Sequence, residues 1–175
     1  MIVRKAMLDD MRKVLKIDGT IRTDRVFKLS KLKENDKYHI KLEVENLQTE
    51  ASFPYEHHPD RLNDSFKDGE IIVADDNGKI VGYSELRLVR WNRSCWVISI
   101  IVDSAYRKQG IGSQILERVK LSAKEFGMRT VMFDLGMSNY PAYRFYMKNG
   151  FKVCGLNDVY YRDSSPAIFM CHQLE

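Results

Sequence analysis

The segment from Val97 to Phe151 constrains the fold of this 175-residue chain more than any other part of the sequence. A β-branched run, Trp96–Val102, leads into a turn with glycines at positions 110 and 112. The run is typical of a strand buried on both faces, and apolar residues at three- and four-residue spacing after the turn predict a helix that ends at Gly127. A strand, a glycine turn and a helix in this order point backbone N–H groups and a helix dipole at an anion such as pyrophosphate. The alternative is an ordinary βαβ crossover whose glycines only make a tight turn.

Two better-known phosphate-binding loops do not fit this turn. A Walker loop ends in Gly-Lys-Ser/Thr, whereas Ser113 and Gln114 follow Gly112. A dinucleotide-binding loop needs a third glycine or an alanine where Ile115 stands. Neither ATP nor NAD is therefore favoured as the ligand.

A second motif, Asn139–Phe151, follows after the next predicted strand. Its Tyr146 supplies a phenol, whose ordinary pKa of ~10 keeps the proton in place at neutral pH and lets it pass to a thiolate that forms beside it. The alternative for Tyr146 is a core aromatic, which is the expectation for Phe145. Together the two motifs predict an enzyme that binds coenzyme A and transfers its acyl group.

The two motifs resemble those of the GNAT superfamily of acyl-CoA-dependent N-acyltransferases. The superfamily loop, Gln/Arg-x-x-Gly-x-Gly/Ala, is matched at Arg107, Gly110 and Gly112. Its later helix, Asn-x-x-Ala-x-x-Phe/Leu-Tyr-x-x-x-Gly-Phe, is matched at Asn139, Ala142, Phe145, Tyr146, Gly150 and Phe151. Within the superfamily the chain is most similar to the streptothricin acetyltransferase group, at Ile17-Asp18, Thr23, Trp91-Asn92 and residues 150–161. The resemblance implies an α/β (α+β) fold, with one mixed, mainly antiparallel sheet of about six to seven strands flanked by about four helices.

The resemblance also implies where acetyl-CoA binds. Backbone N–H groups of the central strand would contact the oxyanion and the pantetheine arm, and the pyrophosphate would lie on the turn, where glycine lets the backbone come close. Tyr146 occupies the position of the general acid. The expected cofactor-binding residues are Ile100, Ile101, Val102, Arg107, Lys108, Gln109, Gly110, Ile111, Gly112, Ser113, Asn139, Ala142 and Tyr146.

The general base is harder to assign. The streptothricin group carries an acidic pair at the positions that align with Ile98 and Ser99, and this chain has no acid there. Glu85, one predicted strand away, is the expected replacement, and Asp134 is the alternative; either would act through a water. A salt-bridged carboxylate with no catalytic role is the other interpretation of Glu85.

The acceptor is expected to be a small-molecule amine. The segment Asp18–His58 would wall its site, and the acidic residues Glu43, Glu45, Glu50 and Glu56 suit a cation such as a streptothricin-type antibiotic, an aminoglycoside or a polyamine. Antibiotic resistance is then the expected role, although these residues could equally be plain surface charge. Two other functions stay open: a protein N-terminal or lysine acetyltransferase, and a non-catalytic acyl-CoA-binding module.

Composition narrows the remaining choices. The net charge of +4 is spread along the chain, which argues against nucleic acid as a partner, and no stretch of ~18 apolar residues predicts a membrane span. Three cysteines without metal-ligand spacing favour free thiols in the cytoplasm, and no metal site is expected. His57-His58 is interpreted as a solvated loop pair. One domain over residues 1–175 is expected, and a homodimer is left open.

The remaining pattern predicts a coarse order of elements. Helices are expected from Met7 to Gly19 and from Pro59 to Phe66, and a loop over Phe53–Pro59. The stretch from 20 to 69 is the least readable, with one half-exposed strand at Tyr38–Val44. The other expected strands are residues 1–6, 70–74, 79–88, 96–102, 131–135 and 167–173.

Overall fold

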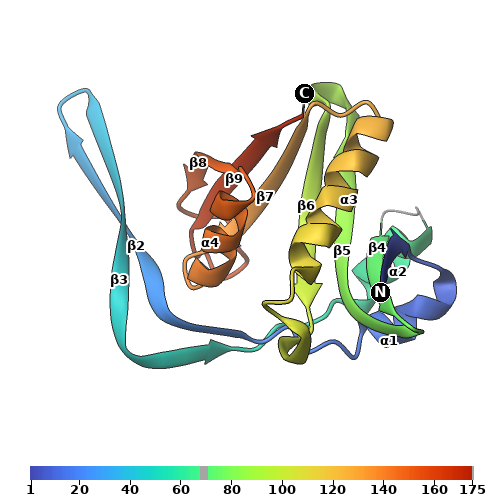
Figure 1. The fold of residues 1–175 in the computed structure, drawn as a ribbon. Helices are drawn as coiled ribbons and strands as arrows, with labels where there is room; N and C mark the ends of the chain where they lie inside the picture. The colour runs from blue at the N-terminus through green and yellow to red at the C-terminus, as the bar shows by residue number, and fades with distance from the viewer. Residues whose placement is uncertain (68–70, 175) are drawn as a thin grey trace. The chain divides into compact units, whose positions relative to one another are not determined.

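The computed structural model describes residues 1–67 and 71–174. Its strands are β1 (Ile2–Lys5), β2 (Ile21–Glu34), β3 (Lys37–Phe53), β4 (Ile71–Asp76), β5 (Lys79–Val89), β6 (Ser94–Val102), β7 (Thr130–Gly136), β8 (Lys152–Asn157) and β9 (Ala167–Gln173) (Figure 1). Its α-helices are α1 (Met11–Val14), α2 (Pro59–Lys67), α3 (Ile111–Glu125) and α4 (Tyr140–Lys148). Short 3₁₀ turns lie at Leu8–Asp10, Arg90–Asn92 and Ser104–Tyr106. None of the helices in these residues is long and apolar enough to cross a membrane.

Seven strands form one mixed sheet in the order β1-β4-β5-β6-β7-β9-β8, and β2 pairs with β3 alone. The pairs from β1 to β6 are antiparallel, whereas β6 and β7 are parallel. A parallel pair needs a crossover, and α3 supplies it. The mixed α/β fold expected from the sequence is confirmed. Glu70, expected to begin a strand, lies outside the described residues.

The contacts divide the chain into two compact units. The first contains Met1–Thr20, Pro54–Phe133 and Cys171–Glu175, and the second contains Ile21–Phe53 and Asp134–Met170. The single domain expected from the sequence stays a prediction. Each unit is described by itself below.

The two faces of β5 in the first unit carry different layers. A Cβ atom added at Gly82 would lie 3.0 Å from Cδ1 of Ile115 on α3, so Gly82 lies on the face of β5 that α3 covers. Side chains alternate along a strand, and Tyr83 accordingly lies on the other face. There it joins a buried cluster supplied by the α1 and α2 segments and the sheet: Val14, Ile17, Leu62, Phe66, Ile71, Val73 and Ile80.

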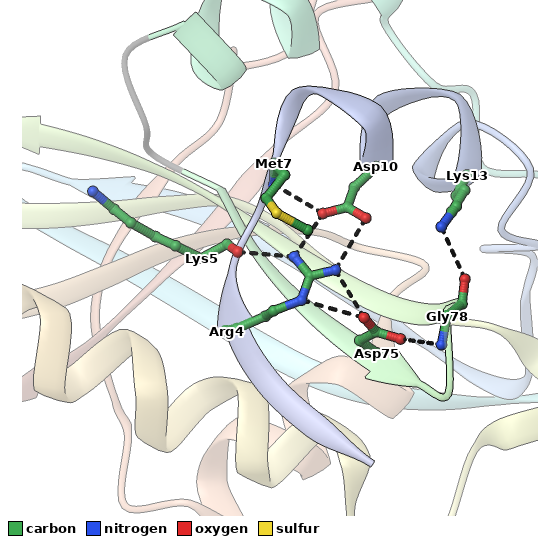
Figure 2. A network of polar contacts seen from close by, with 7 residues as sticks. All are labelled: Arg4, Lys5, Met7, Asp10, Lys13, Asp75 and Gly78. Atoms are coloured by element: carbon green, nitrogen blue, oxygen red, sulfur yellow. Dashed lines mark hydrogen bonds and ion pairs between the residues drawn. The ribbon is translucent and has the colours of Figure 1, made fainter.

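A network of charged groups fixes the start of the first unit (Figure 2). Arg4 on β1 donates to Asp10 at 2.7 Å and to Asp75 on β4 at 2.8 Å. Asp10 also accepts the N–H of Met7, and Asp75 accepts the N–H of Gly78 in the β4–β5 turn.

The helix expected from Met7 to Gly19 is wrong in length, because α1 ends at Val14.

The second unit contains a long two-stranded ribbon, β2–β3, that the sequence analysis missed apart from Tyr38–Val44. Phe27 near its base donates its N–H to the carbonyl of Met137 at 2.8 Å, and its ring packs edge-on against Tyr143 at 5.0 Å. From Ser30 to Lys41 every residue of the ribbon is exposed. A ribbon without a buried face leaves no clear hydrophobic period in the sequence, which explains the omission.

Candidate active site

The glycine turn before α3 has the geometry of an anion site. Lys108 and Gly110 both adopt left-handed conformations, with φ of 62° and 82°. Gly110 is the N-cap residue of α3 and has no side chain that could cap the helix. Its carbonyl accepts the N–H of Gln114 at 3.1 Å. The backbone N–H groups of residues 111–113 therefore have no hydrogen-bond acceptor within the helix. The first turn of α3 also carries no acidic residue that would compete with an anion.

Arg107, the first residue of this motif, is held by backbone carbonyls. Its guanidinium donates to Val102 at the end of β6 at 2.9 Å, to Thr20 at 2.6 Å and to Asp18 at 3.4 Å. The side chain thus ties the loop after α1 to the end of the central strand. Lys108 and Gln109, in contrast, are exposed.

The Asp18 carboxylate strengthens the same junction. It accepts the hydroxyl of Ser104 at 2.7 Å and the N–H of Thr20 at 3.0 Å. These hydrogen bonds, from Thr20 first and then Ser104, lower the pKa of Asp18 to about 2. The group is therefore ionised at every pH at which the enzyme would work.

The central strand β6 contains a β-bulge. Glu85 of β5 lies opposite Ser99, but the next residue, Leu86, lies opposite Val97, so Ile98 is the extra residue. On its other side β6 pairs with β7 only from Ser94 to Trp96, as far as the described residues show. After Trp96, this edge of β6 is not paired with β7 in the described residues, and the unpaired part includes Ile100, Ile101 and Val102.

Glu85, the predicted base, is fully buried in an ion pair. Its two carboxylate oxygens lie 3.0 and 3.1 Å from Nε of Arg61, and the hydroxyl of Ser65 donates to one of them at 2.8 Å. Both partners come from α2. A buried carboxylate needs such partners, so the salt-bridged interpretation of Glu85 describes its position.

Tyr146, the predicted acid, is buried on α4 in the second unit. Burial first, and then the nearby charge of Asp134, raise the pKa of Tyr146 above its usual range. Its ring contacts Phe145 and Phe151, with centroids 5.1 and 5.7 Å away. The phenol therefore keeps its proton at neutral pH, as a general acid must.

Asn139 and Ala142 have a structural role at the start of the same helix. The side-chain oxygen of Asn139 accepts the N–H of Ala142 at 3.2 Å and so caps α4. The predicted site residues are thus gathered in two groups. The glycine turn, the end of β6 and Glu85 lie in the first unit, whereas Asn139, Ala142, Tyr146 and the alternative base Asp134 lie in the second.

The sequence interpretation of His57 is wrong. His58 is exposed, but His57 is half-buried and both its ring nitrogens have partners. Nε2 lies 2.9 Å from the carbonyl of Ile17, and Nδ1 lies 3.2 Å from the hydroxyl of Tyr83. The only sequence signal for this order is the pair of prolines, Pro54 and Pro59, that bracket the segment.

The fold and the turn define an acyltransferase of the mixed α/β class. The chain belongs to the Acetyltransferase (GNAT) family, whose profile matches residues 41–151. Acetyl-CoA is accordingly its acyl donor.

Known proteins similar to this chain act on different acceptors. The N-alpha-acetyltransferase of Sulfurisphaera tokodaii is 28% identical over 145 residues, which cover 76% of this chain and 85% of the relative. Among solved structures, nourseothricin acetyltransferase superimposes with a TM-score of 0.83 at 22% identity, over 99% of this chain and 98% of the other. A Bacillus anthracis protein assigned as a streptothricin acetyltransferase, solved with acetyl-CoA, gives 0.81 at 24% identity over the same shares. At these identities the structural matches establish the fold.

Proposed function

We propose that this enzyme transfers the acetyl group of acetyl-CoA to a primary amine of a small cationic molecule, of the streptothricin type. The observation that carries the proposal is the extent of the structural likeness. The nourseothricin enzyme superimposes on 99% of this chain with a TM-score of 0.83, whereas the ribosomal-protein-S18-alanine N-acetyltransferase of Escherichia coli, which also covers 99% of it, superimposes with 0.66. An antibiotic-modifying role follows from that acceptor.

The residues of the first unit fit the cofactor. The turn and the first amides of α3, residues 109–113, would hold the pyrophosphate, because they combine free backbone geometry with the positive end of a 15-residue helix. The backbone of Ile100, Ile101 and Val102 would contact the pantetheine arm and the oxyanion, because that edge of β6 is outside the ladder with β7. Arg107 would act mainly by holding the turn in place, since its guanidinium already serves three carbonyls.

The chemistry is a direct attack in a ternary complex. The unprotonated amine attacks the thioester carbonyl, the tetrahedral intermediate collapses, and the coenzyme A thiolate leaves. Tyr146 would give the departing thiolate its proton, which the raised pKa keeps on the phenol at neutral pH. Glu85 would act as the base only through a water, because its own oxygens already accept bonds from Arg61 and Ser65.

The acidic residues of the ribbon would attract the acceptor. Glu43 and Glu45 are exposed on β3 and share one face of the ribbon, because they are two residues apart. Glu43 is partly neutralised by Lys41 at 2.8 Å, and it lies opposite Lys28 in the register. Exposed pairs of this kind are worth little, so both carboxylates remain able to exchange partners with a cationic ligand.

The second candidate is a protein N-terminal acetyltransferase. The observation that favours it is the match to the Sulfurisphaera tokodaii enzyme, whose name specifies an α-amine. Its substrate would be a polypeptide terminus instead of a small cation. A cytoplasmic location, a single domain and a homodimer belong to either candidate as predictions.

One assay separates the two candidates. Release of free coenzyme A thiol from acetyl-CoA would be measured with streptothricin, polyamines, aminoglycosides and peptides that carry a free α-amine. The proposal expects the highest kcat/KM for a small cation. Rapid reaction of peptides alone would replace it by the second candidate, and a chain that binds acetyl-CoA without turnover would be a binding module.

A further inference from the structure

A polar cluster lies on the α1 and α2 side of the first unit, beneath the segment from Pro54 to His58. It contains His57 from that segment, Tyr83 and Glu85 from β5, and Ser99 from β6. Glu85 lies opposite Ser99 in the β5–β6 register, and Tyr83 is two residues before Glu85, so all three side chains share one face of the sheet. No motif in the sequence connects them with His57.

The two partners of His57 fix its protonation pattern. The carbonyl of Ile17 can only accept a hydrogen bond, so Nε2, at 2.9 Å, carries the proton. In the neutral ring Nδ1 is then the acceptor, and it receives the hydroxyl proton of Tyr83 at 3.2 Å. The basic nitrogen of His57 thus points at a buried phenol.

The hydroxyl of Ser99 is the polar group at the other end of this cluster. Its hydroxyl is buried and has no hydrogen-bond partner among the residues that the structure describes. Ser99 lies diagonally across the β5–β6 ladder from Tyr83, on the same face of the sheet, and 7% of the residue is exposed. A buried hydroxyl without a partner is rare in proteins and calls for a ligand group or a water beside it.

The position of Ser99 gives the unmet hydroxyl a meaning. It lies directly opposite Glu85 in the β5–β6 ladder. Glu85, the nearest carboxylate, already accepts hydrogen bonds from Arg61 and Ser65. A second route for the proton of the acceptor ammonium, one that does not use Glu85, would start at Ser99.

We infer that Ser99, Tyr83 and His57 form a relay that carries this proton away from the acceptor amine, with His57 as its terminal base. The inference rests on the proposed acetyl transfer to an amine. The ammonium gives a proton to Oγ of Ser99, directly or through one water. The Ser99 hydroxyl proton passes to the phenol oxygen of Tyr83, and the Tyr83 proton passes to Nδ1 of His57. The amine is left neutral, both hydroxyls are restored, and the positive charge ends on the imidazolium of the half-buried His57, which then loses a proton to solvent.

Several titratable and charged groups surround His57. Tyr55 packs edge-on against its ring at 5.2 Å, and the ring of Tyr83 lies 6.0 Å away. Asp18 follows Ile17, whose carbonyl holds Nε2–H, and Arg107 approaches that loop from the β6 side. The Glu85–Arg61 pair is the remaining charged group, contributed by β5 and α2. Burial, followed by Tyr55, raises the pKa of Tyr83 above its usual range, so the phenol is protonated at neutral pH.

The test compares matched variants by their pH profiles. His57→Gln, Tyr83→Phe and Ser99→Ala interrupt the relay. His58→Gln changes the exposed neighbour, and Ser84→Ala removes a second buried hydroxyl without a partner, which lies on the α3 face of β5. For each variant kcat/KM for the best amine would be measured from pH 6 to 10 with saturating acetyl-CoA.

The relay predicts a deficit that depends on pH. His57→Gln should lose on the order of 10²-fold at neutral pH, which is a typical contribution of general base catalysis. The loss should shrink toward the pKa of the amine, because the acceptor then arrives unprotonated. The KM for acetyl-CoA and both control variants should be unchanged. Tyr83→Phe keeps the ring and its packing, so it carries the same prediction if His57→Gln fails to fold.

A merely structural role gives a different result. Relay variants that are folded and lose the same factor at every pH, or lose nothing, would overturn the relay and leave the proposed function intact. A wild-type enzyme that releases no thiol with any amine would overturn the proposed function and the relay with it.

Discussion

The guanidinium of Arg107 donates to the carbonyl of Thr20 at 2.6 Å, across 87 residues of sequence. The residue that opens the glycine motif thus holds the loop that follows α1. Because the same group also bonds Val102 at the end of β6, the cofactor turn and the loop after α1 share one support. Disturbing the cofactor turn at this residue should therefore be felt in the loop as well.

Removal of this support should affect stability as well as binding. Arg107→Ala leaves the carbonyls of Val102 and Thr20 without their donor, and we expect the free energy of unfolding to fall by about 1–3 kcal/mol. KM should rise for acetyl-CoA and for the amine together. Urea denaturation and initial-rate kinetics would measure both effects. Lys108→Ala, at the exposed neighbour, is the control, and an equal loss there would refute the special role of Arg107.

The turn predicts how two glycine substitutions differ. Gly112→Val puts a branched side chain at the helix start, where phosphate must approach the backbone, and acetyl-CoA affinity should fall tenfold or more in a folded protein. Gly110→Asn should bind much more nearly like the wild type, since asparagine tolerates positive φ and a Cβ atom there meets nothing within 4 Å. Calorimetric titration with coenzyme A distinguishes them, and unchanged binding by Gly112→Val would disprove the site.

Tyr146→Phe tests the general acid. The ring and its contacts with Phe145 and Phe151 remain, so the free energy of unfolding should change by no more than about 1.5 kcal/mol. Turnover should fall by on the order of 10²-fold. Tyr143→Phe removes a half-buried phenol from the same helix and should stay active. A Tyr146→Phe enzyme with full turnover, under conditions where chemistry limits the rate, would leave the phenol only a packing role.

The acidic ribbon predicts a salt-dependent KM for the amine. Reversal of Glu43 and Glu45 to lysine should raise that KM and spare the KM for acetyl-CoA. Added salt should do the same in the wild type, because exposed charges are screened beyond about 8 Å at physiological ionic strength. Glu34→Lys, at the end of β2, is the matched control. If the KM for the amine changes neither with added salt nor with the charge reversal, the acceptor binds elsewhere.

The Arg4 network predicts a loss of stability in acid. Burial raises the pKa of Asp10, but the bonds from Arg4 and the Met7 N–H outweigh it, and Arg4 likewise lowers the pKa of Asp75. Both folded values lie below the unfolded value of about 4, so the contribution is complete above that pH and is lost as the pH falls through the folded values. Asp10→Asn should lower stability at pH 7 by about 1–3 kcal/mol and flatten its acid dependence.

Denaturation by urea between pH 3 and 7 measures this effect. Asp9→Asn, at the exposed preceding residue, should keep the wild-type slope. Parallel acid profiles for Asp10→Asn and the wild type would show that the Arg4 network does not cause the dependence.

The strands and helices that were predicted correctly are determined by patterns in the local sequence. The β-branched run and the three- and four-residue spacing after Gly112 fall within β6 and α3, and the last strand has the bounds expected. The ribbon depends instead on distant partners: Phe27 packs against Tyr140 and Tyr143, more than a hundred positions away. The hydrophobic periodicity of neighbouring residues contains no information about such distant contacts.

The candidate site shows the same division. Motif spacing predicted the glycine turn, whose left-handed residues are a property of the local backbone. The environment of Glu85 could not be predicted, because Arg61 and Ser65 reach it from another element. His57 was misinterpreted for the same reason, since Ile17 and Tyr83 give it order only in the folded chain.

The β-bulge at Ile98 has a consequence for the acid missing from the central strand. Because of the extra residue, position 99 and not 98 stands opposite Glu85. A carboxylate restored at position 99 would face a second carboxylate directly across the ladder, and like charges so placed repel. With Glu85 in the neighbouring strand, the uncharged serine at position 99 avoids this repulsion.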